Sequence, residues 1–133
     1  MNQRIGQIAI VVRDYDEAIQ FYTEKLNFKL IEDTKLSETK RWVVISPGGS
    51  GGSSLLLAKA VTEEQSSRVG NQTGGRVFLF LYTDDLYRDY QNLLEQKIKI
   101  VREPSAESFG TVLVFSDLYG NLWDLIEHLN PKT

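Results

Sequence analysis

The sequence of 133 residues contains no cysteine and a single histidine, His128. Without cysteine there is no thiol nucleophile, no disulfide framework, and no site in which thiolates hold zinc or an iron–sulfur cluster. One histidine also excludes a metal site built from several imidazoles of the same chain. A chain of this length buries roughly two-thirds of its unfolded surface, so a hydrophobic core alone can stabilise it.

Positive charge is also scarce. The sequence has 15 Lys and Arg residues against 18 Asp and Glu residues, which gives a net charge of −3. This balance argues against nucleic acid or an anionic membrane as the partner. The apolar run near the N-terminus is too short for a signal-peptide core or a membrane span. We therefore expect a cytoplasmic protein whose partner is a small molecule.

The hydrophobic pattern predicts the same set of elements twice. Laying Gln7 on Phe78 also lays Asp14 on Asp85, and after one deletion Phe28 falls on Ile98. Each copy predicts one strand, one helix and three further strands. The first copy has a strand at 5–12, a helix at 14–26 and strands at 28–33, 41–46 and 54–59. The second has a strand at 77–82, a helix after Asp84 and Asp85, and strands at 98–102, 111–116 and 122–127.

The repeat predicts an α+β fold made of two βαβββ modules. We place the first module at 5–61, a polar linker at 62–75 and the second module at 76–128, within a single domain of 1–133. The two modules are expected to form a curved, eight-stranded mixed sheet.

Strand alternation predicts two chemically different faces in each module. Ile8, Ile10 and Val12 form an aliphatic face that should pack on the helix. The residues between them, and their equivalents in the second module, should point away from the helix into a cup enclosed by the curved sheet. These residues are Gln7, Ala9, Val11, Phe78, Phe80 and Tyr82. A cup of this kind is the natural place for a ligand.

Three segments then resemble one known family. They are IAIVVRDYDEAIQFYTEKLNF near the start, LFLYTDDLYRDYQNLLEQ in the middle and FGTVLVFSDLYGNLWDLIE near the end. Over residues 5–128 the chain resembles the vicinal oxygen chelate superfamily, which includes glyoxalase I, fosfomycin and bleomycin resistance proteins and extradiol dioxygenases. These motifs are typical of the fold and do not specify an activity.

In metal-dependent members of that family, two residues from each module hold one divalent ion. The resemblance places these four positions at Gln7, Leu56, Phe78 and Asp124. Gln7 and Asp124 can donate oxygen to a hard cation, whereas Leu56 and Phe78 cannot. The metal site is therefore expected to be degenerate. A divalent metal remains possible if Tyr82, Glu103, Glu107 or a partner chain supplies the missing ligands.

Aromatic and acidic residues on the cup side are the candidate ligand contacts. The predicted ligand-binding set is Gln7, Trp42, Phe78, Phe80, Tyr82, Glu107, Phe109, Phe115 and Asp124. An aromatic lining favours a flat or cationic apolar ligand. Each aromatic could instead fill the core, Gln7 could satisfy backbone groups, and Asp124 could form a salt bridge. Glu107 and Phe109 could belong to an ordinary exposed loop, and His128 is expected at the surface.

Two functions follow from these observations. The first is a binding protein without catalysis that holds an aromatic or cationic ligand, and the resemblance to bleomycin resistance proteins implies a homodimer. The second is a lyase or dioxygenase-like enzyme that uses either a divalent metal at Gln7 and Asp124 or acid–base chemistry by Asp124. A carboxyl group with a raised pKa could abstract a proton next to a carbonyl.

Overall fold

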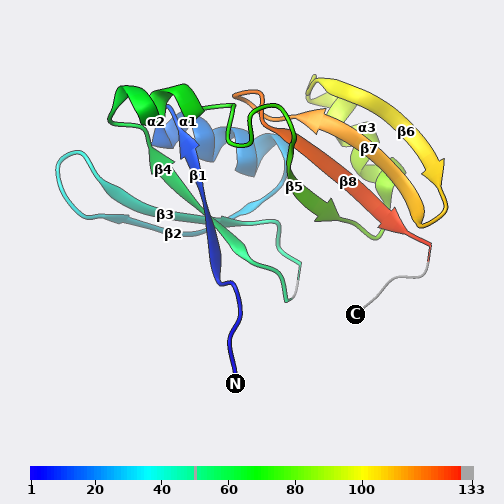
Figure 1. Cartoon of the computed structure of the whole chain (residues 1–133), viewed down its shortest axis with the longest axis horizontal. Coiled ribbons are helices and arrows are strands. Elements are labelled where there is room, and N and C mark those ends of the chain that lie inside the picture. The colour runs from blue at the N-terminus through cyan, green and yellow to red at the C-terminus, as the bar shows by residue number, and fades with distance from the viewer. Residues whose placement is uncertain (50, 130–133) are drawn as a thin grey trace. The chain divides into compact units, whose positions relative to one another are not determined.

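The computed structural model describes residues 1–49 and 51–129, and the chain divides into two compact units at Val69 and Gly70 (Figure 1). The first unit contains β1 (Gln7–Val12), α1 (Tyr15–Gln20), the π-helical turn η1 (Phe21–Lys25), β2 (Lys29–Lys35), β3 (Arg41–Ser46), β4 (Ser54–Lys59) and α2 (Glu63–Arg68). The second contains β5 (Val77–Tyr82), α3 (Leu86–Glu95), β6 (Ile100–Glu107), β7 (Gly110–Ser116) and β8 (Leu122–His128). None of the helices in the described ranges is long and apolar enough to cross a membrane.

Both units have the same sheet topology. The strand order is β1-β4-β3-β2 in the first unit and β5-β8-β7-β6 in the second. The first strand of each unit runs parallel to the last, and the other pairs are antiparallel. A parallel pair needs a crossover connection. The predicted α+β fold with two βαβββ copies is confirmed, and its eight strands lie in two four-stranded sheets.

The helical segment of the first unit is one residue longer than that of the second. Asp14 and Asp85 cap the two helices, and their carboxylates accept hydrogen bonds from the third residue beyond them, at 2.9 and 3.1 Å. Asn27 and Lys97 end the segments in the left-handed region, with φ of 61° and 58°. The π-helical turn η1 accommodates the extra residue in the first unit. The deletion needed to align the two copies therefore falls inside this helical segment.

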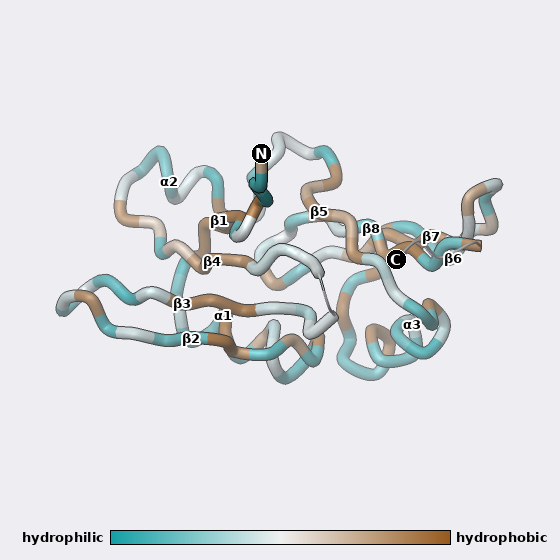
Figure 2. The backbone as a smooth tube through the Cα atoms, turned by 90° about the horizontal axis from the view of Figure 1, so that it is seen from below, coloured by the Kyte–Doolittle hydropathy of each residue, from teal (hydrophilic) through white to brown (hydrophobic). Residues whose placement is uncertain are grey.

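The alternation predicted for β1 is present. Ile10 and Val12 are fully buried, whereas Gln7 and Ala9 are exposed. Figure 2 shows long hydrophobic segments on β3 and β4, the two central strands of this sheet. The first sheet therefore has one face covered by helix and a second face that is only partly covered.

The polar stretch 62–75, expected to be a linker, contains helix α2 and the boundary between the units. The hydroxyl of Thr62 accepts a hydrogen bond from the backbone N–H of Gln65, at 3.1 Å. In return the side chain of Gln65 accepts one from the backbone N–H of Val61, at 2.8 Å. This reciprocal arrangement resembles a capping box, and the T-x-x-Q spacing is its sequence signal. The helix contacts β1.

Strand β6 extends further than predicted. It begins at Ile100 and continues to Glu107, through Pro104, with irregular pairing near Arg102 and Ser105. An edge strand tolerates proline because one of its sides makes no ladder hydrogen bonds. Glu107 was expected in a loop but lies on this strand, opposite Gly110.

Asp117 organises the turn between β7 and β8, and its side chain is only 6% exposed. One carboxylate oxygen accepts hydrogen bonds from the backbone N–H groups of Tyr119, Gly120 and Asn121. The other accepts from the side-chain amide of Asn121 at 3.0 Å and from the indole of Trp123 at 3.1 Å. Charge-assisted bonds of this kind stabilise a buried carboxylate. The motif D-x-x-G-N-x-W therefore specifies a turn.

Replacing Asp117 with alanine is expected to lower the free energy of unfolding by about 3 kcal/mol, because it leaves several buried donors without an acceptor. Urea unfolding followed by circular dichroism would measure the change. Asp84→Ala removes an exposed carboxylate from the same unit and should leave the midpoint close to that of the wild type. Equal midpoints for Asp117→Ala and the wild type would contradict this role.

Candidate functional site

A cavity of about 540 Å³ lies in the first unit, where strands β3 and β4 diverge. The pairing between these strands ends at Val43 and Leu57, although both strands continue beyond that pair. The cavity lining comes from the strands, the β2–β3 hairpin and α2. It consists of Val11, Tyr15, Ser37, Thr39, Lys40, Arg41, Trp42, Leu56, Leu57, Ala58, Lys59, Val61 and Gln65.

The floor of the cavity is apolar and belongs to the sheet face turned away from the helix. Val11 lies opposite Ala58 in the parallel pair of β1 and β4. Leu56 lies two residues before Ala58 and therefore shares its face. Trp42 of β3 also lines the cavity. The structure thus places Trp42 and Leu56, two residues singled out from the sequence, in one hollow.

Tyr15 closes the cavity on the helix side. Its ring is 7% exposed, and its hydroxyl accepts a hydrogen bond from the backbone N–H of Arg41, at 3.2 Å. Arg41 lies beyond the last β3–β4 pair, so the tyrosine hydroxyl substitutes for a strand partner. The gap between the strands therefore does not leave this buried donor unpaired.

The side chain of Arg41 ties three elements together. Its guanidinium forms a bidentate pair with Asp33, with nitrogen–oxygen distances of 2.6 and 3.1 Å, and also bonds Asp16 at 2.9 Å. It lies 5.1 Å from the centre of the Tyr15 ring. The hydrogen bonds from Arg41 hold the pKa of Asp33 below its ordinary value. This network stiffens the wall, and it already neutralises the charge of Arg41.

The mouth of the cavity is polar. Ser37, Thr39 and Lys40 contribute from the hairpin between β2 and β3, which is the cyan loop in Figure 1. Val61 and Gln65 contribute from the beginning of α2. The Ser37 hydroxyl oxygen accepts a hydrogen bond from the backbone N–H of Lys40, at 3.1 Å, which shapes the hairpin.

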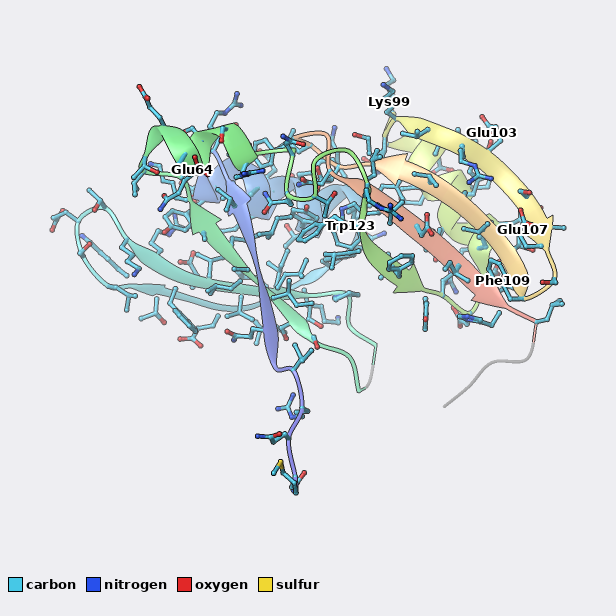
Figure 3. All side chains as sticks on the ribbon, in the orientation of Figure 1. Glu64, Lys99, Glu103, Glu107, Phe109 and Trp123 are labelled. Atoms are coloured by element: carbon cyan, nitrogen blue, oxygen red, sulfur yellow. The ribbon has the colours of Figure 1, made fainter. Side chains whose placement is uncertain are left out.

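A second group of candidate residues lies on the second unit. Phe80 and Tyr82 of β5 are 61% and 68% exposed. Tyr82 meets His128 edge to face, with ring centres 4.5 Å apart, and Phe109 lies 6.4 Å from the same imidazole. Phe109 is at the turn between β6 and β7 (Figure 3). We call Phe80, Tyr82, Phe109 and His128 the aromatic patch.

Asp124 lies on the same sheet face as Phe80, its partner in the parallel pair of β5 and β8. Burial raises the pKa of Asp124, and the nearby positive charge of Arg102 partly opposes that shift. Its carboxyl group therefore takes up a proton more readily than an exposed aspartate does. This environment is the one that general acid–base catalysis requires, as the sequence suggested.

The structure corrects the expected position of Phe115. Phe115 pairs with Trp123 across β7 and β8, and the two rings stack at 5.8 Å. It therefore lies on the face opposite Asp124, is 1% exposed, and fills the core. The sequence alone does not set the register of β7 against β8, which decides this face.

The other candidates are more scattered. Gln7 is exposed and pairs with Ser54, and Phe78 is half-buried at an irregularity in the β5–β8 pairing. Glu107 accepts a hydrogen bond from the Ser105 hydroxyl, at 3.0 Å. The sequence analysis did not single out Tyr15, Lys40 or Gln65, because only the divergence of β3 and β4 brings them to one cavity.

A family model for the Glyoxalase/Bleomycin resistance protein/Dioxygenase superfamily matches residues 4–125. The chain belongs to this superfamily. A protein of Shewanella frigidimarina (strain NCIMB 400) is 61% identical over 133 residues, which are 99% of this chain and 98% of that protein. These matches confirm the family resemblance seen in the sequence.

Two solved structures of the same fold are also similar. UcmS2 is 28% identical with a TM-score of 0.82, over 95% of this chain and 98% of that one. TnmS3, an antibiotic binding protein from Streptomyces sp. CB03234, is 26% identical with a TM-score of 0.75, over 96% and 97% of the two chains. The superfamily neighbours of this chain therefore include a protein that binds an antibiotic.

The superfamily's usual metal chemistry does not fit the four matching positions. Leu56 and Phe78 carry hydrocarbon side chains, so only Gln7 and Asp124 offer donor atoms. Within residues 1–49 and 51–129, no group of three or more His, Cys, Asp or Glu side chains is arranged to hold a metal ion. We derive no reaction step through a metal at these positions.

Asp124→Asn is expected to stabilise the protein at neutral pH. A raised pKa means that the folded state binds the proton more tightly than the unfolded state, so ionisation costs stability as the pH rises through the folded-state pKa. Asparagine cannot ionise and avoids that cost. The gain should disappear below about pH 3.9, where the carboxyl group is protonated in both states.

Urea unfolding between pH 3 and pH 8 would measure this dependence, with Asp33→Asn as the matched control of opposite sign. The pKa of Asp33 is lowered, so its ionised form stabilises the fold above the unfolded-state pKa. The control variant should therefore be less stable than the wild type at neutral pH, and the loss should fade as the pH falls. Equal behaviour of the two variants would refute the assigned environments.

Proposed function

We propose that this protein binds a small aromatic molecule without transforming it, and that the cavity of the first unit holds the ligand. The cavity itself carries the proposal. Its volume of about 540 Å³ falls within the range of roughly 300–1,000 Å³ that small-molecule sites occupy. Such sites combine apolar walls with a few polar groups, and here the floor is apolar and the mouth is polar.

Trp42 is the anchor that we propose for the ligand. A half-buried indole offers a large flat surface on which an aromatic ring can stack. Tyr15 and Arg41 fix the wall beside it, so little ordering is needed when a ligand enters. The likeness to TnmS3, an antibiotic binding protein, supports a binding role for this chain as well.

We further propose that the aromatic patch of the second unit contacts a ligand or a cationic part of it. Phe80 and Tyr82 expose their rings, and aromatic faces attract cations. Asp124 on the same sheet face would add a negative charge when ionised, and Glu107 lies on the neighbouring strand β6. This proposal retains Gln7 and Phe78 as ligand contacts rather than metal ligands.

Ala58→Phe tests the site by filling the cavity from its floor. N-phenyl-1-naphthylamine, a neutral aromatic probe, should quench Trp42 fluorescence in the wild type. The variant should bind this probe at least tenfold more weakly, because a phenyl ring occupies the space that the ligand needs, and tenfold corresponds to about 1.4 kcal/mol.

Ala106→Phe is the matched control, since Ala106 is exposed on β6 of the other unit. It should bind the probe as the wild type does. Both variants should melt near the wild-type temperature when no probe is present. Unchanged binding by folded Ala58→Phe would place the ligand elsewhere and contradict the proposal.

We also propose that the protein forms a homodimer through exposed apolar side chains. Phe80 and Tyr82 expose large rings on an edge strand, and patches of this kind mark interaction surfaces. Light scattering at micromolar concentration should return twice the chain mass of 15.1 kDa. The double variant Phe80→Ser, Tyr82→Ser should return a single chain, whereas a monomeric wild type would refute the dimer.

A further inference from the structure

The charges around the first-unit cavity are of one sign. Lys40, Arg41 and Lys59 line the cavity, and none of the described lining residues is Asp or Glu. This contrasts with the whole sequence, in which acidic residues outnumber basic ones. A local excess of positive charge in an acidic chain is a feature that a ligand could read.

Two of the three cationic side chains are not neutralised within the protein. Arg41 is paired with Asp33 and Asp16, as described above. Elsewhere in the described part of the chain, carboxylates lie within 4.0 Å of Arg13, Lys35, Arg68 and Arg88 only. The ammonium groups of Lys40 and Lys59 therefore have no ion-pair partner there, and they are available to a ligand.

The two lysines flank the apolar floor. Lys40 precedes Trp42 by two residues, and Lys59 follows Ala58 directly. Each charge is carried on a flexible stem and can turn toward a group at the mouth. At physiological ionic strength charges are felt over about 8 Å, so both lysines act on a ligand that fills this cavity.

We propose that the cavity selects a planar aromatic compound that carries an acidic group, a carboxylate or a sulfonate. The ring stacks on Trp42 above the floor of Val11 and Ala58, and the anion lies at the mouth near Lys40 and Lys59. This inference rests on the proposed binding function and names the ligand class of that site. It reverses the cationic preference expected from the sequence for this part of the protein.

The hydrogen-bonding groups at the mouth suit the same ligand. The Ser37 oxygen accepts backbone N–H bonds, which leaves its hydroxyl hydrogen to donate. The carbonyl oxygen of the Gln65 side chain is used by Val61, so its amide nitrogen faces no competing backbone acceptor in that pair. Hydroxyl and amide donors next to two ammonium groups form a site for oxyanions.

A pair of probes with one skeleton tests the charge preference. 1-Anilinonaphthalene-8-sulfonate carries a sulfonate, whereas N-phenyl-1-naphthylamine has the same rings without it. The double variant Lys40→Gln, Lys59→Gln should bind the sulfonate probe about tenfold more weakly, since each exposed ion pair contributes up to about 1 kcal/mol. Its affinity for the neutral probe should stay within twofold of the wild type. Only the fluorescence signal that Ala58→Phe removes counts as binding in the cavity.

The control is Lys29→Gln, Lys99→Gln, which changes the net charge equally at two lysines outside the cavity lining. It should bind both probes as the wild type does. Raising the salt concentration should weaken the sulfonate probe in the wild type and barely affect it in Lys40→Gln, Lys59→Gln.

The outcomes separate the two proposals. If neither probe binds the wild type in the cavity, the proposed function fails and this inference fails with it. If the neutral probe binds but the lysine substitutions leave the sulfonate probe unaffected, or weaken both probes equally, only the acidic-ligand inference is overturned. A selective loss of the sulfonate probe, absent in the control, supports it.

Discussion

Burial of one face of the first sheet against its helix is the constraint on which the rest of this unit depends. Because strand side chains alternate, packing Ile10 and Val12 into the core sends Val11 to the opposite face. That face has no long helix of its own in the unit. It becomes a floor for a ligand because β3 and β4 separate after Val43 and Leu57. Tyr15 and Arg41 then hold the separated strands in place, so the hollow is part of the folded structure and does not depend on a ligand to form.

The two copies of the βαβββ unit use the same topology for different purposes. In the first copy the face turned away from the helix is hollowed and bordered by lysines. In the second copy the corresponding face carries Phe80, Tyr82 and Asp124, so it is aromatic and partly acidic. Duplication followed by divergence of side chains explains how one topology supplies two chemical environments, because the backbone ladder constrains the alternation and leaves the side chains free to differ. It also explains why the metal positions are lost as a set, since each copy keeps only one residue with a donor atom there.

Much of the fold could be predicted from the sequence, because its signals are local. Strands β3, β4 and β5 begin and end where the hydrophobic pattern places them, and Asp14 and Asn27 mark the ends of the first helical segment. The errors share one physical origin, which is pairing between distant strands. Phe115 lies in the core because β7 pairs with β8 in a register that puts it beside Trp123. Glu107 lies on a strand because β6 continues through Pro104 as an edge. Helix α2 had a local signal in Thr62 and Gln65, and its capping spacing could have been found without the structure.

The sequence by itself determined the two βαβββ copies, the family, and the loss of donor atoms at Leu56 and Phe78. These follow from residue types and from periodicities that act over a few residues. Only the tertiary structure decided where a ligand could bind, because the cavity requires β3 and β4 to separate and brings the hairpin, α2 and Tyr15 to one place. It also decided the sign of the charge there. Lys40 and Lys59 are far apart in the chain and unremarkable in composition, and they become a joint feature only when the fold lines one hollow with both.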